Sequence, residues 1–206
     1  MPTRIISASL PETISKAQKE IQQGKLIAFR TDTVYGLAAD INNSHAIEKL
    51  FIAKGRDFNK AIAVLISDLS QIEMLTTNFN DQALILANHF WPGALTIIVV
   101  KRSNLPRNLS PTSTIGIRMP DHDFARNLLR RTGPLATTSA NLSGMTNPLT
   151  AQDVMDQLHD RIDLIIDGGS CPGGTPSTVV DCTKAEPVIL RQGLITAYEI
   201  RKTLQR

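Results

Sequence analysis

The chain has 206 residues, of which 42% are hydrophobic and 20% are charged, an ordinary composition for a soluble globular protein. No segment approaches the roughly 20 apolar residues of a membrane span and no long apolar run follows the N-terminus, so we expect a soluble, cytoplasmic protein without a membrane partner. The 22 Lys and Arg residues exceed the 19 Asp and Glu residues, and a net charge of +3 permits a phosphate-bearing ligand or RNA without requiring either.

The first third of the chain alternates amphipathic and apolar stretches. Apolar residues recur at helical spacing after Pro11 until Gly24 stops the helix, and residues 25–29 follow as a predicted strand. Ser44 is predicted to cap a second helix, and residues 61–66 form the next buried strand.

The same alternation continues through the middle of the chain. Asn80 opens an apolar helix that is predicted to end near residues 91–93, and residues 94–100 and 114–118 are two further strands. Asp121 is predicted to cap the next helix, which a glycine closes.

The last third contains the clearest helix signals. Residues 134–138 extend towards a turn, and Thr150 and Thr196 each begin a capping box that opens a helix. Three strand-like runs lie between these two helices, at residues 164–166, 177–180 and 188–190.

About seven strands interleaved with five or six helices predict an α/β fold with a mixed, twisted open sheet and flanking helices, in one domain over residues 1–206. Short connections such as the one after Val180 indicate some antiparallel pairing, so we do not expect a purely parallel, doubly wound sheet.

The first candidate site is residues 31–37, directly after a strand. Two threonine hydroxyls, a carboxylate and a phenol fall within five residues, at the place where open α/β sheets bind their ligands. The alternative is a polar turn with Tyr35 packed on the core.

The second candidate is cationic. Lys54, Arg56 and Lys60 follow a helix and precede a strand, where they could clamp a phosphate. The alternative is that the helix dipole alone favours cations at this helix end.

The third candidate is residues 139–144, which follow Thr137 and Thr138 and are rich in hydroxyls without forming a Walker-type phosphate loop. Arg118 and Arg191 each end an apolar strand and could converge on an anion if those strands are neighbours. A generic polar loop and two solvated strand ends are the alternatives.

The sequence shows no motif of a catalytic nucleophile or of metal ligands. Cys171, Cys182 and four scattered histidines match no zinc or redox motif, so we expect free thiols and no metal-ligand cluster. Cations and hydroxyls suit positioning and charge neutralisation in phosphoryl or nucleotidyl transfer.

Seven segments in this order resemble the YrdC/YciO family of L-threonylcarbamoyladenylate synthases. They are residues 31–37 (TDTVYGL), 53–56 (AKGR), 91–96 (WPGALT), 114–120 (TIGIRMP), 139–144 (SANLSG), 177–181 (STVVD) and 190–193 (LRQG). The resemblance covers nearly the whole chain and matches the short form of the family.

The resemblance implies a reaction of ATP, bicarbonate and L-threonine that yields threonylcarbamoyl-AMP and pyrophosphate. A tRNA threonylcarbamoyl-transfer machinery then modifies tRNA, and some family members have been linked to double-stranded RNA. The implied fold is a twisted open sheet with a basic central cavity.

The resemblance also implies roles for individual residues. The threonine would be held by Thr33, Arg118 and Ser177. Catalysis would fall to Lys54 and Arg56, and the ATP site to Lys54, Arg56, Lys60, Thr114, Thr137, Ser139, Asn141 and Arg191. Mg²⁺ is the expected companion of ATP, held mainly by phosphates and water.

Some positions depart from the family pattern. Arg30 stands where a proline is usual, Lys60 and Ala61 replace the usual Asn-Pro or Lys-Pro, and a histidine near Leu65 is missing. The intact triplet at residues 139–141 favours a synthase over the YciO branch.

Two other readings stay open. One is a YciO-like protein that binds nucleotide without this activity. The other is a double-stranded RNA or tRNA-binding module, based on a set of basic residues whose alternative is a solvated helix face: Lys101, Arg102, Arg107, Arg126, Arg130 and Arg131.

Overall fold

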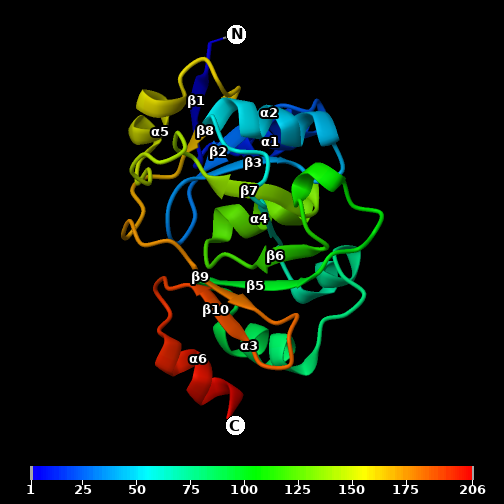
Figure 1. Ribbon diagram of the computed structural model, residues 1–206. Coiled ribbons are helices and arrows are strands. Elements are labelled where there is room, and N and C mark those ends of the chain that lie inside the picture. Colours follow the sequence, from blue (N-terminus) through cyan, green and yellow to red (C-terminus); the bar gives the residue numbers. More distant parts are fainter. Residues whose placement is uncertain (1, 206) are drawn as a thin grey trace.

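The computed structural model describes residues 2–205, and one mixed sheet runs through this part of the chain (Figure 1). Its ten strands lie in the order β1-β8-β2-β3-β7-β4-β6-β5-β9-β10. The strands are β1 (Arg4–Ser7), β2 (Ile27–Phe29), β3 (Gly36–Asp40), β4 (Ala63–Leu65), β5 (Leu95–Val100), β6 (Thr114–Arg118), β7 (Leu135–Ser139), β8 (Leu164–Asp167), β9 (Thr178–Asp181) and β10 (Val188–Arg191).

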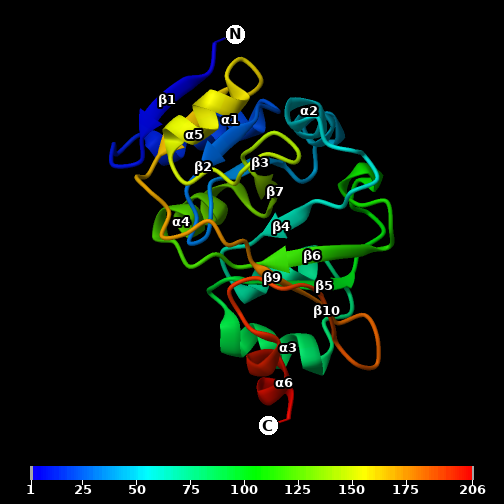
Figure 2. The same cartoon turned by 60° about the vertical axis from the view of Figure 1, so that its left-hand side comes forward.

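Helices flank the sheet on both faces and at its far end. They are α1 (Thr13–Gln22), α2 (Ser44–Lys54), α3 (Asp81–Phe90), α4 (Asp123–Thr132), α5 (Ala151–Leu158) and α6 (Ala197–Leu204), with short 3-10 turns η1 (Leu69–Met74) and η2 (Arg107–Leu109). Figures 1 and 2 place β1 and α6 at opposite ends of the molecule. Within residues 2–205, no helix combines the length and the apolar character that crossing a membrane would demand.

Alternating residues of the central strands feed two apolar clusters, as expected for a sheet covered on both faces. Phe29 of β2 packs in one cluster with α1 and α4, whereas the preceding Ala28 packs in the other with α2 and α5. In β3, Ala38 belongs to the first cluster and its neighbours Leu37 and Ala39 to the second.

The mixed sheet confirms the expectation of antiparallel pairing. β9 and β10 pair antiparallel across the short connection after Val180, while β5 and β9 pair parallel. β7 pairs antiparallel with β3 on one side and β4 on the other, and β4 pairs parallel with β6. This order places β3, β7 and β6, which carry two candidate segments and Arg118, close together in the middle of the sheet. Arg191 ends β10, which β5 and β9 separate from β6, so the strands of the two arginines are not neighbours as the sequence left open.

Most predicted helix ends are confirmed, and two caps are corrected. Thr150 and Thr196 form capping boxes as expected. The cap of α2 is Asn43 rather than Ser44, because Asn43 has extended backbone and its side chain accepts the N–H of Ala46 at 3.0 Å. Likewise His122, not Asp121, caps α4.

Two strands were not predicted from the sequence. β1 is a sheet edge with mostly exposed residues, so its short apolar content gives little signal. β3 has the sequence Gly-Leu-Ala-Ala-Asp, whose alanines and glycine favour strands weakly. Its position between β2 and β7 makes it a buried strand, because tertiary packing outweighs local preference here.

Candidate functional site

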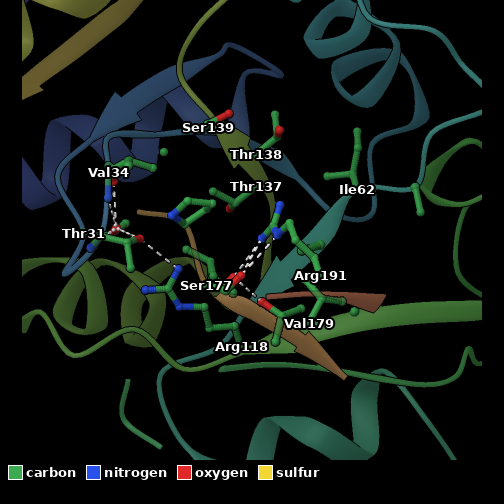
Figure 3. Close-up of a pocket in the computed structure, with 18 of the residues that line it drawn as sticks. Thr31, Val34, Ile62, Arg118, Thr137, Thr138, Ser139, Ser177, Val179 and Arg191 are labelled. Carbon is green, nitrogen blue, oxygen red and sulfur yellow. Dashed lines mark hydrogen bonds between the residues drawn. The ribbon is translucent and has the colours of Figure 1, made fainter. Parts of the chain in front are cut away.

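A cavity of about 340 Å³ opens over the central strands (Figure 3). Seven of the residues predicted for the site line it: Thr33, Arg56, Arg118, Thr137, Ser139, Ser177 and Arg191. The register of the paired strands brings some of these residues together. Ser139 of β7 pairs with Gly36 of β3, and Thr137 lies between Ala38 of β3 and Ala63 of β4.

The turn at residues 31–34 is fixed by its own hydroxyl group. The Thr31 Oγ1 accepts the backbone N–H groups of Thr33 at 3.1 Å and Val34 at 3.3 Å, and it donates to the Val34 carbonyl at 2.7 Å. Thr31 is 4% and Thr33 is 1% exposed, and both line the cavity. The turn is therefore rigid and presents buried hydroxyls to the cavity.

Tyr35 is buried in the core, as expected if residues 31–37 were a polar turn with a structural tyrosine. Its hydroxyl donates to the Gly169 carbonyl at 2.8 Å and accepts the Gly168 N–H at 3.1 Å. Burial is the main cause that raises the pKa of Tyr35 to about 12, so the phenol stays protonated. The segment thus combines a structural tyrosine with cavity-facing threonines.

Arg118 is held by three hydrogen bonds from its three guanidinium nitrogens. Nε donates to the Gly93 carbonyl at 3.0 Å, Nη1 to Thr33 Oγ1 at 3.0 Å and Nη2 to Asp32 Oδ1 at 2.6 Å. The Arg118 and Asp32 side chains are 8% and 15% exposed, so the ion pair is largely withdrawn from water. These three hydrogen bonds together fix the orientation of the Arg118 guanidinium group.

Arg56 and Arg191 bring two more positive charges to the same cavity. Arg56 Nη2 donates to the Ala61 carbonyl at 3.0 Å, and Arg191 donates to the Ser177 carbonyl from Nε at 3.2 Å and Nη2 at 2.9 Å. Burial first, then the charges of Arg118 and Arg56, lower the pKa of Arg191. Cations that repel one another in a part-buried space favour an anionic ligand.

Hydroxyl groups complete the lining between these cations. The Ser177 and Thr96 hydroxyls lie 2.8 Å apart, and Arg191 Nη2 donates to Ser177 Oγ at 3.2 Å. In Figure 3 the guanidinium group of Arg118 lies on the side of Thr31, and that of Arg191 lies nearer Ile62.

Four residues expected at the nucleotide site do not line the cavity. Lys60 is exposed and Thr114 is half-buried, with its hydroxyl 2.8 Å from that of Thr112. Lys54 is 2% and Asn141 is 5% exposed, and both lie behind the lining.

Lys54 is bonded to the segment that carries Ser139. Its ammonium group donates to the carbonyl oxygens of Ser139 and Asn141, both at 2.5 Å, and to Asn141 Oδ1 at 3.1 Å. Burial, followed by the charge of Arg56, lowers the pKa of Lys54 to about 7. The three acceptors occupy the three N–H bonds of an ammonium group, so Lys54 holds the backbone here.

Some lining residues were not assigned a role from the sequence. Gly36 and Gly116 keep the cavity open, because an added Cβ would come within 2.9 Å of Thr137 Cγ2 and Thr96 Cγ2, respectively. Asn147 also lines the cavity, and its Nδ2 donates to the Gly174 carbonyl at 3.1 Å. A glycine inside a strand can mark a close approach of a ligand, and this was the signal by which Gly36 and Gly116 could have been found from the sequence.

Arg30 has a structural explanation in the fold. Its Nη1 donates to the Gly168 carbonyl at 2.9 Å, and a Cβ on Gly168 would lie 3.2 Å from the Arg30 Cβ. Arg30 therefore packs on the loop after β8 and is not part of the cavity lining. Across residues 2–205, no three His, Cys, Asp or Glu side chains gather as a metal site would require.

Comparisons with known proteins match most of this chain. The model of the Sua5/YciO/YrdC family, described as telomere recombination, matches residues 19–193. A threonylcarbamoyl-AMP synthase of Bacillus subtilis is 41% identical over 194 residues, which are 93% of this chain and 56% of that relative.

Two solved structures are similar. P. abyssi Sua5 complexed with L-threonine has a TM-score of 0.94 at 38% identity and covers 98% of this chain and 61% of its own. E. coli YciO has a TM-score of 0.86 at 26% identity and covers 96% of this chain and 99% of its own. The chain therefore spans little more than half the length of the Bacillus subtilis relative and about three fifths of the Sua5 chain.

Proposed function

The chain belongs to the Sua5/YciO/YrdC family, and from this premise we propose that it is an L-threonylcarbamoyladenylate synthase, a nucleotidyltransferase. It combines L-threonine, bicarbonate and ATP into threonylcarbamoyl-AMP and releases pyrophosphate. The observation that carries the proposal is the meeting of Arg56, Arg118 and Arg191 in one hydroxyl-lined cavity. Such a set of cations suits a triphosphate together with a carboxylate.

The threonine end of the cavity is proposed at Thr33, Arg118 and Ser177. The Thr31 hydroxyl donates to the Val34 carbonyl, and its two lone pairs accept the N–H groups of Thr33 and Val34. Arg118 donates to the Thr33 hydroxyl oxygen, which keeps its proton and one lone pair for a ligand. The Thr33 hydroxyl suits the amine or hydroxyl of L-threonine and leaves the carboxylate to Arg118.

The nucleotide end is proposed at Arg56, Arg191, Thr137 and Ser139. The amine of threonine and bicarbonate form N-carboxythreonine with loss of water. A carbamate oxygen then attacks the α-phosphorus of ATP while the bond between that phosphorus and the departing pyrophosphate oxygen breaks. Arg56 and Arg191 stabilise the charge that develops on pyrophosphate.

The four residues behind or beside the lining keep supporting roles in this proposal. Lys54 and Asn141 position Ser139 through their hydrogen bonds to its segment. Lys60 and Thr114 lie outside the lining and would meet the nucleotide where it extends beyond the cavity. ATP would bring Mg²⁺ with it, held by its phosphates and by water, because the described residues offer no carboxylate cluster for the ion.

The product has a defined use in this proposal. A tRNA threonylcarbamoyl-transfer machinery in the cytoplasm would take threonylcarbamoyl-AMP and modify tRNA. Direct binding of double-stranded RNA lacks comparable support, because Arg126 and Arg130 on α4 bond to Asp123 and Asn127 of the same helix. E. coli YciO has a similar fold, so the fold does not separate the synthase from the YciO-like alternative, and an activity assay is needed.

One assay tests the proposal against both alternatives. Pyrophosphate release from ATP is measured with threonine and bicarbonate together and with each one omitted in turn. The proposal expects release only in the complete mixture. Release that ignores threonine, or no release while ATP still binds, would favour the YciO-like reading, and salt-sensitive RNA binding without release would favour the RNA module.

A further inference from the structure

We infer that Asp32, which does not line the cavity, is the positioning residue that makes Arg118 a carboxylate receptor for the amino-acid substrate. The inference rests on the proposed function and deepens it. Asp32 would never touch the substrate and would act through the guanidinium group of Arg118.

The hydrogen bonds of Arg118 explain how this works. A guanidinium group carries five N–H bonds. One on each nitrogen is used within the protein, on Gly93, Thr33 and Asp32, which leaves one free N–H on each terminal nitrogen. Two free N–H bonds on one planar group match the two oxygens of a carboxylate.

The charge of Asp32 separates this end of the cavity from the other. Among the cavity arginines of the described chain, Arg118 alone is paired with a carboxylate, whereas Arg56 and Arg191 bond to backbone and hydroxyl oxygens. Asp32 offsets the charge of Arg118, so this end attracts a polyphosphate less strongly, and a carboxylate is recognised here through the two free N–H groups. The other two arginines keep their full charge for a polyphosphate.

The turn holds Asp32 in place for this task. The Thr31 hydroxyl bonds the N–H groups on both residues after Asp32, so the backbone on either side of the carboxylate is fixed. At 15% exposed, the Asp32 side chain has little water to compete with Arg118. Loss of its charge would leave the Arg118 guanidinium group without its only carboxylate partner among the described residues and free to change its orientation.

The test compares the binding of L-threonine with that of L-threoninol, which keeps the amine and hydroxyl but lacks the carboxylate. Calorimetry gives both dissociation constants for the wild type, Asp32→Asn and Asp32→Glu. Asp123→Asn removes a carboxylate from a surface ion pair and serves as the matched control.

If Asp32 positions Arg118, Asp32→Asn weakens L-threonine binding about tenfold or more, as for a partner lost from a buried charge pair. Binding of L-threoninol and of ATP should change by less than about twofold, so only the carboxylate preference falls. Asp32→Glu, which keeps the charge, should retain more of that preference than Asp32→Asn.

Three outcomes would overturn the inference. They are unchanged L-threonine binding in Asp32→Asn, an equal loss for threonine and threoninol, and an equal loss for threonine and ATP. Equal weakening of threonine and threoninol binding would mean that Asp32 acts on the substrate amine. Equal weakening of threonine and ATP binding would mean that Asp32 has a general structural role. If the wild type binds threonine and releases pyrophosphate, these outcomes sink the inference alone. A wild type that does neither sinks the proposed function as well.

Discussion

The ammonium group of Lys54 donates to both oxygens of Asn141, to the backbone carbonyl at 2.5 Å and to Oδ1 at 3.1 Å. Because Asn141 Oδ1 also accepts the Ser139 hydroxyl at 2.6 Å, one buried cation fixes the wall of the cavity that carries Ser139. A lysine expected to face phosphates thus acts on the shape of the site from behind it.

The buried Lys54 predicts a pH dependence of stability. Its pKa is lowered from 10.5 to about 7 in the folded chain, so between those two values the unfolded chain binds more protons. Stability therefore rises with pH across this window, by at most about 1.4 kcal/mol per pH unit, and the Lys54→Met variant lacks that gain. Urea unfolding of both proteins between pH 7 and 10 measures the difference.

The exposed Lys19 on α1 offers a control, because Lys19→Met removes a lysine without touching the cavity. If the unfolding free energies of wild type and Lys54→Met run parallel over the whole pH range, burial does not depress protonation of Lys54.

Asn141→Ala should destabilise the fold. The substitution leaves the Ser139 hydroxyl, one bond of Lys54 and the Met145 carbonyl without their partner. We expect a loss of about 1–3 kcal/mol in the free energy of unfolding. Thermal and urea unfolding measure it against Asn127→Ala on the exposed face of α4, and equal effects of the two substitutions would contradict the central position of Asn141.

Arg56→Ala should lower the rate of pyrophosphate release strongly and change the free energy of unfolding little. Arg56 lines the cavity, and its hydrogen bonds to the described residues are limited to the one from Nη2 to the Ala61 carbonyl, so we expect a modest contribution to the fold. Pyrophosphate release should fall by about 100- to 1000-fold, as when one donor to a developing charge is removed. Arg131→Ala at the exposed end of α4 is the control, and an Arg56→Ala enzyme with undiminished release would remove Arg56 from the phosphate site.

Divalent metal should bind with the nucleotide and not before it. Since the described residues contain no group of metal ligands, Mg²⁺ alone should leave the melting temperature unchanged. Mg²⁺ with ATP should raise it, and chelation should stop pyrophosphate release until Mg²⁺ is restored. A clear stabilisation by Mg²⁺ alone would point to a protein-held metal site.

The sequence predicted strands and helices where their periodicity was strong. The capping boxes at Thr150 and Thr196 are local patterns, and both are confirmed. β3 was not predicted, because Ala38 and Ala39 become strand residues only through pairing with β2 and β7. Local preference carries no information on such pairing.

The site was predictable as a set of residues, but the direction of each side chain was not. Arg118 ends β6 and Arg191 ends β10, two strands that are not neighbours, yet both side chains line the cavity. Lys54 differs, because its last-turn position on α2 points the ammonium group to Ser139 and Asn141. Which oxygen a long side chain reaches depends on the tertiary fold.

The most direct test of the account follows the carbon of bicarbonate. Labelled bicarbonate is supplied with ATP and L-threonine, and the AMP-linked product is separated and counted. The account predicts label in a nucleotide product only when all three substrates are present, with one pyrophosphate released per labelled product. Pyrophosphate release without label in the nucleotide, or label that appears without threonine, would contradict it.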